Sequence, residues 1–565
     1  MASILRRIEK KIALENYSNE ANEDLLPSPP EARTWTWWNY SSVWAGQSLD
    51  ATWWSVGSSF ISVGLTVKQT IAPVLIGCAI LGVAAVLNAT FGAHYHVGFP
   101  AMIRPTFGVT GSKWFVGLRG LIGIVWYAIQ VFYAAQLMNI MWICVFGHIY
   151  KDWNPPVPSS AGTDAKTIMN YFLAWGISLP LSLLHPSKLR AVFSTRAMFG
   201  FIAFFTMFVW CTVLGQKDPA GFKGFSILQE NPISGAAVGW ATMSSINSIL
   251  ATTAPMITNQ SDVSRYAKTP EQAGWPQGMT IFVTKTVIAF FSIISAASLQ
   301  SRYGGIAKWN IWDQLDLLLN ENWSAATRCG CFIIALGVFY SVLVTNAYCN
   351  TVPFGADIAA IFPRYFNMIR GQILVTLVSM PVVPWQILTN AQAFLTFLGS
   401  YTFLMGALLG CQWGDFVLRR GNYHVPSMFD YSKDSIYMYS PRGYNWRGFA
   451  AWLIAFCVIF PGLVAAYIPE KLSIAAQRIY SMGWLLGVPL AGFSYLAFNI
   501  LFPVPVLPAK HSEDPVAKKW LGMSELHGIF PGDTINGGDS ASTDGSSIAG
   551  DEKEKSSVTV LAVMA

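Results

Sequence analysis

Residues 42–66 read SVWAGQSLDATWWSVGSSFISVGLT, a stretch long and apolar enough to cross a lipid bilayer as one helix. In its second half Gly57, Ser58 and Ser59 follow one another, and such a run weakens a helix. A broken membrane helix exposes backbone carbonyls that can bind a cation, so we expect an interruption near these residues. Asp50, in the same stretch, is either a proton-accepting carboxylate inside the membrane or a residue near its surface.

The composition of the whole chain is that of an integral membrane protein. Of its 565 residues, 53% belong to the hydrophobic set AVILMFWYC and only 12% are charged, whereas soluble proteins carry about 25% charged residues. So few charges cannot coat several water-facing domains, and the lipid bilayer is an expected partner. The net charge of +6 is spread thinly, so we expect no nucleic-acid partner. Metal-site spacings and catalytic motifs such as HExxH and GxSxG are absent, so we expect no metal, no cofactor and no enzymatic activity.

Twelve runs along the chain approach the roughly 20 apolar residues that a membrane helix needs. The expected spans are 42–66, 71–92, 115–146, 167–185, 195–214, 236–258, 277–299, 325–351, 371–388, 392–417, 448–468 and 480–503. Loops after the even-numbered spans carry the excess of basic residues, which is typical of the cytoplasmic side, so both termini are expected in the cytoplasm. These basic residues are Arg104, Lys113, Lys188, Arg190, Arg196, Arg364, Arg370, Arg419, Arg420, Arg442 and Arg447.

The irregular first and sixth spans lie five spans apart. Breaks at corresponding places in two five-helix halves are the signature of an inverted-repeat transporter. We therefore expect an N-terminal tail (1–40), two five-helix repeats (41–215 and 235–417), two further helices (446–503) and a disordered C-terminal tail (504–565). The tails are candidates for binding ubiquitination or trafficking machinery.

Polar residues within the expected spans indicate where a solute would bind. Trp126 and Gln130 lie one turn apart on one helical face, where an indole can stack on a flat ring and an amide can pair with its edge. Taken alone, a W-x-x-x-Q pair is more often explained by ordinary packing. Asn346 and Asn350 form a similar pair in the eighth span, and Pro255 predicts a break near Thr252–Ala254 in the sixth. These residues predict a carrier with a midplane site for a small, planar, polar solute.

Five segments also resemble motifs of the nucleobase–cation symporter-1 family, in particular its fungal uracil/uridine/allantoin branch, which also contains thiamine and nicotinamide riboside carriers. The likeness runs from about Leu25 to Pro503. The segments are RTWTWWNYSSVW (33–44), NQSDVSRYAK (259–268), GADIAAIFPRYFNMIRGQ (355–372), VPWQILTNAQAFLTFLGSY (383–401) and YNWRG (444–448).

The resemblance implies an all-α, LeuT-like fold of twelve spans, with a 5+5 inverted repeat and two extra helices, in the fungal plasma membrane. It implies substrate contacts from Trp126, Gln130, Asn350, Asn346, Thr253, Gly57 and Ser58. It implies cation-coupling candidates at Asp50, Val56, Ser59, Ser341 and Thr345, and a cytoplasmic gating motif with Asn259, Asp262 and Arg265. Val344 stands where bacterial relatives carry a second sodium-binding hydroxyl, which favours H⁺ as the coupling ion and leaves Na⁺ as the alternative.

The leading hypothesis is a proton-coupled importer of uracil, allantoin, uric acid or uridine that works by alternating access. One alternative is a thiamine or nicotinamide riboside transporter of the same fold. Another, from a different class, is a nutrient receptor that binds its ligand without moving it.

Overall fold

The computed structural model describes residues 13–14, 24–183, 190–217, 235–468 and 472–505, so Lys188 and all but the first two residues of the expected C-terminal tail (504–565) lie outside them. In this part of the chain the regular structure is helical, apart from one isolated bridge between Trp35 and Ala267. The longer helices are α2 (Trp37–Ser48), α3 (Ala51–Ser62), α4 (Val67–Tyr95), α7 (Ser112–Phe146), α9 (Ala165–Ser178), α10 (Arg190–Gln216), α11 (Ala236–Thr258), α13 (Trp275–Tyr303), α14 (Ile311–Glu321), α15 (Ala325–Asn346), α16 (Val352–Ile361), α17 (Met368–Val378), α19 (Ala391–Leu418), α21 (Trp446–Tyr467), α22 (Ile474–Ser481) and α23 (Gly483–Leu501).

Short elements connect these helices. They are η1 (Pro30–Ala32), α5 (Phe99–Met102), α6 (Arg104–Phe107), α8 (His148–Lys151), η2 (Ser159–Ala161), η3 (Leu179–Leu183), α12 (Ser261–Ser264), η5 (Pro270–Ala273), the π-helical η6 (Ala347–Thr351), α18 (Pro384–Ile387) and α20 (Val425–Phe429).

Helix occurs in every one of the twelve expected ranges, and the all-helical prediction is confirmed. Within the described residues, eight helical segments are long and apolar enough to cross a membrane, so this is a multi-pass membrane protein. The four ranges that fall short are interrupted, short or polar. The first divides into α2 and α3, the fourth turns from α9 into η3, the sixth is the Ser/Thr-rich α11, and the ninth divides into α17 and α18.

The first span is broken, but not where its sequence indicates. The helix is interrupted at Leu49 and Asp50, and α3 runs unbroken past Gly57–Ser59, so the prediction of a break near Val56–Ser59 is wrong. Gly57 serves a different purpose: α3 approaches α13 so closely there that a Cβ would collide with the Ser292 hydroxyl. The small residues therefore permit tight helix packing, as they commonly do in membranes.

The sixth span is continuous, so the predicted break near Thr252–Ala254 is also wrong. Pro255 lies inside α11 and removes the N–H that would pair with the Ala251 carbonyl. The Tyr401 hydroxyl of α19 donates to that carbonyl at 3.0 Å and replaces the missing bond. Because a neighbouring helix satisfies the freed group, the proline is accommodated without a break.

The eighth span is irregular, as its polar pattern predicts. Between α15 and α16 the chain takes one π-helical turn, η6, and the Thr351 hydroxyl donates to the Asn346 carbonyl at 3.2 Å. Single π-turns inside helices frequently mark functional sites.

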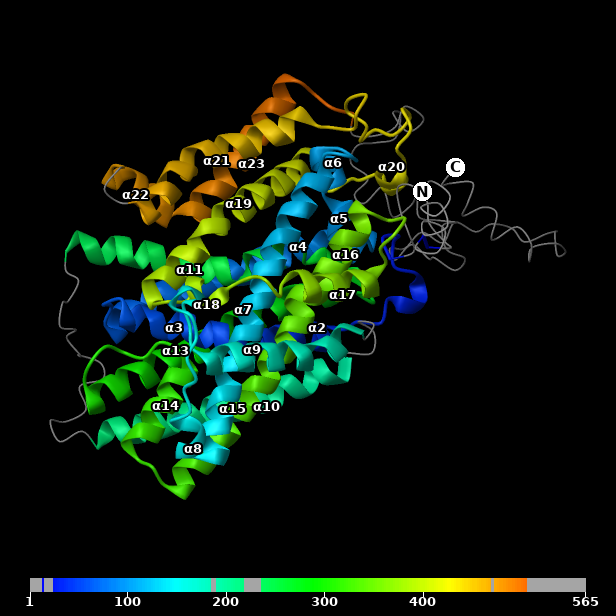
Figure 1. The fold of residues 1–565 in the computed structure, drawn as a ribbon. Helices are drawn as coiled ribbons and strands as arrows, with labels where there is room; N and C mark the ends of the chain where they lie inside the picture. The colour runs from blue at the N-terminus through cyan, green and yellow to red at the C-terminus, as the bar shows by residue number, and fades with distance from the viewer. Residues whose placement is uncertain (1–12, 15–23, 184–189, 218–234, 469–471, 506–565) are drawn as a thin grey trace.

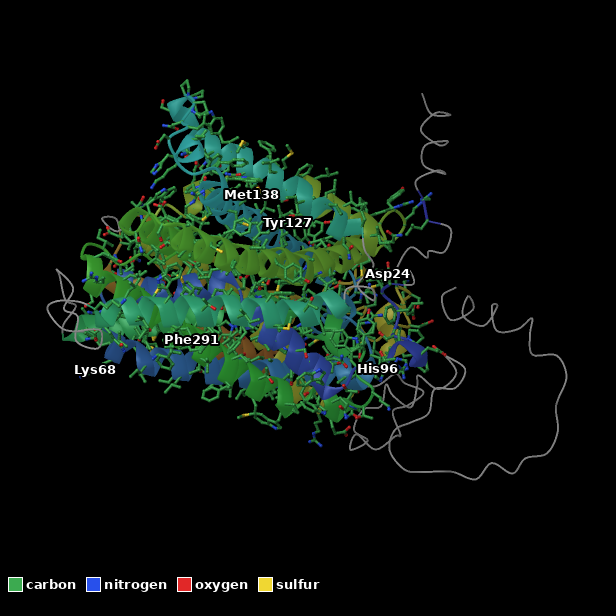
Figure 2. All side chains as sticks on the ribbon, turned by 90° about the horizontal axis from the view of Figure 1, so that it is seen from below. Asp24, Lys68, His96, Tyr127, Met138 and Phe291 are labelled. Carbon is green, nitrogen blue, oxygen red and sulfur yellow. The ribbon has the colours of Figure 1, made fainter. Side chains whose placement is uncertain are left out.

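The helices form a bundle in which α19, α21 and α23 lie together on one side, away from α10, α14 and α15 (Figure 1). The helix α7 packs between α15 and α9, while α13 packs against α2, α3, α4 and α10. Figure 2 shows Asp24 and His96 at one end of the bundle and Lys68 at the other, as expected for the two ends of α4.

Three basic residues assigned to loops by their sequence, Arg104, Arg196 and Arg419, have buried side chains, and Arg196 lies within a long helix. Arg196 belongs to α10 and its side chain is fully buried. Its use as a cytoplasmic loop charge is therefore wrong, and it contributes to the site described next.

Candidate functional site

The interruption of the first span is stabilised by Asp50. This residue is extended (φ −130°, ψ 148°) and caps the N-terminus of α3, where its Oδ2 accepts from the Thr52 N–H at 3.0 Å. A carboxylate at this position satisfies a free amide and faces the positive end of the helix dipole. Just before the break, the Leu49 carbonyl accepts from the Ser341 hydroxyl of α15. Asp50 is buried among the helices, 2% exposed.

Gln130 of α7 joins the broken helix to the third span. Its Nε2 donates to Asp50 Oδ2 at 3.1 Å and to the Thr52 hydroxyl at 3.0 Å. Both amide protons are thereby used, while Gln130 Oε1 has no partner among the described residues. Gln130 thus presents an acceptor for a ligand that carries an N–H group.

Trp126 lies one turn before Gln130 and is 6% exposed. Its indole meets two aromatic rings of α19, with centroids 5.8 Å from Phe397 and 6.2 Å from Tyr401. The Tyr401 ring stands nearly perpendicular to it, at 85°. The side chain faces the protein interior, which is the orientation that a stacking role requires.

Asn346 and Asn350 bracket the π-helical turn. Asn350 Nδ2 donates to Asn346 Oδ1 at 2.9 Å, and Asn346 Nδ2 donates to the Tyr127 carbonyl of α7 at 3.3 Å. This chain fixes the orientation of both amides, and the Asn350 side chain reaches the cavity between the helices.

A small cavity of about 40 Å³ collects these groups. It has room for water only, so a ring must displace side chains to be admitted. Three lining residues carry buried oxygens without partners in the described structure: Gln47 Oε1, Asp50 Oδ1 and Gln130 Oε1. Its lining consists of Gln47, Asp50, Thr52, Trp53, Trp126, Gln130, Thr252, Pro255, Met256, Thr345, Cys349 and Asn350.

Several predicted substrate contacts lie away from this cavity. Thr253 is buried outside the lining and hydrogen-bonds with the Thr252 hydroxyl, and the sixth span lines the cavity with Thr252, Pro255 and Met256 instead. Gly57 packs against α13, and the Ser58 hydroxyl donates to the Ser292 carbonyl at 3.1 Å. Asn346 supports Asn350 without lining the cavity itself.

Apart from Asp50 Oδ1, the side-chain and backbone oxygens of the predicted cation-coupling residues described here are engaged in hydrogen bonds. Arg196 Nη1 donates to the Thr345 hydroxyl at 3.2 Å, and its Nη2 donates to the Val43 carbonyl of α2 at 3.1 Å. The Ser59 hydroxyl donates to the Val56 carbonyl at 2.7 Å, within α3. A guanidinium from α10 therefore lies between the broken first span and α15.

The predicted gating residues lie at the end of α11, beyond the cavity. Arg265 donates to the Ser28 hydroxyl and to the carbonyls of Asp24 and Leu26 at 2.6–3.0 Å. Asp262 Oδ1 accepts from the Phe99 N–H at 2.7 Å, and Asn259 Nδ2 reaches its Oδ2 at 3.3 Å. Arg265 thus holds the segment before α2, while Asp262 joins α12, which follows α11, to the start of α5.

Sequence reasoning missed four members of the site region: Gln47, Trp53, Arg196 and Lys285. The sequence places Gln47 and Trp53 in the first span without distinguishing them from their neighbours, although both line the cavity. Lys285 lies in TIFVTKTVIAFF, the middle of an otherwise apolar span, and an intramembrane lysine is a signal that the sequence does contain.

A larger hollow lies elsewhere and differs in kind. About 510 Å³ is enclosed between the start of α11, the start of α19 and α22, with Arg478 stacked on Trp240 at 5.0 Å. No helix is interrupted there, and its lining does not include the Trp126–Gln130 face. Size does not identify the candidate site either, because a groove of about 630 Å³ beside α7 and α16 is larger still; the position beside the interrupted first span does.

A multi-pass bundle that encloses polar groups at an interrupted helix defines a membrane transport protein. Comparison with known proteins gives the same class. The family model described as permease for cytosine/purines, uracil, thiamine and allantoin matches residues 27–487, and the chain belongs to this family.

Individual relatives and solved structures agree with this assignment. The chain is 30% identical to the allantoin permease of Saccharomyces cerevisiae over 511 residues, 89% of this chain and 80% of that one. It is also 30% identical to the uracil permease of the same yeast, over 87% of this chain and 77% of that one. Among solved structures, the nucleobase-cation-symport-1 family transporter Mhp1, closed with bromovinylhydantoin bound, has a TM-score of 0.66 at 16% identity and covers 87% of this chain and 98% of its own. The chain therefore shares the fold of Mhp1.

Proposed function

We propose that this permease imports a neutral, flat heterocycle such as uracil or allantoin, by proton-coupled symport with alternating access. The observation that carries the proposal is the convergence of Trp126 with the unpartnered Gln130 Oε1 beside the break of the first span. The indole supplies a stacking face, and the amides supply the directional contacts that distinguish one ring edge from another. The names of the yeast relatives support the same substrate class.

The position of Arg196 favours a proton over sodium as the coupling ion. Thr345 would have to offer its hydroxyl to a sodium ion, but this hydroxyl is hydrogen-bonded to the Arg196 guanidinium. A fixed positive charge at this place repels a second cation. Proton coupling therefore fits the site better than sodium coupling.

The architecture that we propose has twelve spans, with 5+5 inverted repeats (41–215 and 235–417) followed by the helices within 446–503. The four ranges that fall short of a simple spanning helix support this reading, because interrupted or polar spans are expected around a transport site. We place the permease in the plasma membrane with both termini in the cytoplasm, and we assign the tails to ubiquitination or trafficking machinery.

A cationic substrate is the second candidate. Asp50 Oδ1 lies at the cavity without a partner, and a carboxylate attracts a cationic ring such as that of nicotinamide riboside or thiamine. A yeast nicotinamide riboside transporter is 25% identical over 78% of this chain and 72% of its own. The positive charge of the nearby Arg196 guanidinium offsets the negative charge of Asp50, which disfavours a cationic substrate.

The test is uptake of radiolabelled uracil and allantoin by a permease-null yeast strain that expresses the chain. We expect a protonophore to abolish uptake and sodium-free medium to leave it unchanged. Unlabelled uracil or allantoin should inhibit uptake of the label more strongly than thiamine or nicotinamide riboside does. Uptake that persists with the protonophore would overturn the coupling, and stronger competition by the cationic vitamins would favour the second candidate. Saturable binding without accumulation would identify a receptor instead.

A further inference from the structure

Lys285 stands in the middle of α13, surrounded by protein. Among the described lysines it is the only buried one, with 0% of its surface exposed. It is also the only charged residue of α13 before Arg302. At this depth the side chain cannot extend to the membrane surface as interfacial lysines do. A buried lysine inside a membrane marks a functional position by default.

The Lys285 amine has no hydrogen-bond partner among the described residues. Its Nζ lies 4.1 Å from the centroid of the Trp53 ring, and the Trp53 Nε1–H donates to the Lys285 carbonyl at 2.8 Å. An indole face stabilises an ammonium only in part, and an ammonium without a counter-ion or hydrogen bonds is costly to bury. An ammonium at this place therefore lacks the contacts that would hold its charge, and water that reached the amine would supply them.

The titratable groups around Lys285 do not neutralise it. Those close enough to influence it are Cys78 of α4, Cys349 of η6 and Asp50. Asp50 is already hydrogen-bonded by Gln130 and Thr52, and it shares the field of the Arg196 guanidinium. Around the cavity the acidic group is Asp50 and the basic groups are Arg196 and Lys285. Because Asp50 is already influenced by Arg196, Lys285 is left without a partner charge.

Trp53 connects this amine with the transport site. Its side chain lines the cavity together with Asp50 and Trp126, and the Lys285 amine lies over its indole ring. Both belong to the packing of α3 against α13, which involves the half of the first span after the break. A displacement of α3, or of the Trp53 ring on ligand binding, changes the surroundings of the Lys285 amine.

We propose that Lys285 binds and releases the coupled proton, and that Trp53 links its protonation to the occupancy of the cavity; this rests on the proton symport proposed above. In the outward-open arrangement the amine lone pair takes a proton from external water and becomes an ammonium. Closure around the substrate and opening to the cytoplasm expose the ammonium to internal water, which accepts the proton and restores the neutral amine. Asp50, in contrast, has a structural part as the cap of α3.

The experiment uses the full chain in proteoliposomes, with labelled uracil and allantoin as probes and an internal pH dye. Wild type should acidify the lumen when either substrate is added. One coupled proton and a gradient of about one pH unit should support about tenfold accumulation. Lys285→Met should still exchange internal for external label but lose both the pH signal and the tenfold accumulation. Lys285→Arg should lose them as well, because a guanidinium does not release its proton.

Lys68→Met is the matched control, since Lys68 is exposed at the start of α4. It should retain coupling, and Lys285→Met should melt no earlier than wild type because removal of an unpaired polar group does not destabilise a core. Proton uptake and accumulation by either Lys285 variant at the level of Lys68→Met would overturn the assignment while leaving the symport intact. Absence of exchange or accumulation of both probes by wild type would overturn the proposed function itself.

Discussion

The cavity at the first-span break and the charged network at the end of the bundle that holds Asp24 and His96 are both buried and polar, yet their central side chains are engaged differently. At the cavity, Gln47, Asp50 and Gln130 each retain an oxygen without a partner among the described residues. At the Asp24–His96 end, Arg265 donates to three acceptors of the segment before α2, although single atoms nearby such as Asn259 Oδ1 lack a partner in the described structure. Unused polar groups can bind a ligand, whereas fully engaged ones hold the fold. Substitutions in the first region should therefore affect affinity, and those in the second stability.

The largest effect is expected from the buried ion pair between Arg119 of α7 and Asp357 of α16. Asp357→Ala leaves the guanidinium unpaired and should destabilise the protein by about 3–5 kcal/mol. Thermal melting of the detergent-solubilised protein measures this. The exposed Glu271→Ala is the control. The double variant Arg119→Met/Asp357→Leu should recover stability because it removes both charges, and a double variant as unstable as the single one would contradict this reading.

At the cavity, Trp126→Ala should weaken substrate affinity by about 1–3 kcal/mol, which is about 5–150-fold, because it removes a stacking face. Competition uptake gives the affinity. Trp114→Ala is the matched control on the same helix, since Trp114 is 68% exposed. If both variants bound the substrate like wild type, Trp126 would have no part in the site.

The end of the bundle that holds Arg265 should also respond to acid through His96, which lies outside the spans and ends α4 with φ 55°. Burial, with a smaller contribution from Arg33, lowers the pKa of His96 to about 4. Since its unfolded pKa is about 6.5, the unfolded chain takes up this proton first as pH falls, and stability declines between the two values. The loss should be about 2 kcal/mol at about pH 5.

His96→Asn should flatten this pH profile, because asparagine tolerates the left-handed conformation and carries no titrating ring. Melting temperatures measured across this range check the prediction. An unchanged slope in the variant would assign the acid sensitivity to other groups.

The smallest effect is expected from Asn350→Ala. Asn350 contributes one amide to the cavity, so its loss should weaken affinity by about 1 kcal/mol, or about fivefold, with little change in stability. Exposed Asn322→Ala serves as the control in the same uptake measurements. A melting temperature that fell as far as in Asp357→Ala would place Asn350 with the structural network and not with the site.

The same contrast explains how much the sequence could predict. The spans and the Trp126–Gln130 face follow from hydropathy and helical spacing, because both depend on local pattern. The position of the helix break does not: Gly57–Ser59 is the weakest local segment, but it is straightened by packing against Ser292 of α13. Likewise Pro255 does not break α11, because Tyr401, nearly 150 residues away in the chain, replaces the missing bond.

The burial of charged residues within helices also does not follow from the local sequence. Arg196 follows a hydrophilic stretch and resembles a loop residue in sequence, and only tertiary contacts with Thr345 and Val43 identify it as an interior group. Asp50 could not be placed at the surface or in the interior from its neighbours alone. Its burial depends on Gln130, which lies 80 residues further along the chain.

The most direct test of the central claim is a structure of the purified permease with uracil or allantoin bound. The account predicts the ring against the Trp126 indole, in hydrogen-bond reach of Gln130 and Asn350, beside the break between α2 and α3. A ring bound in the larger hollow between α11 and α22, with the Trp126 face left as it is, would contradict it.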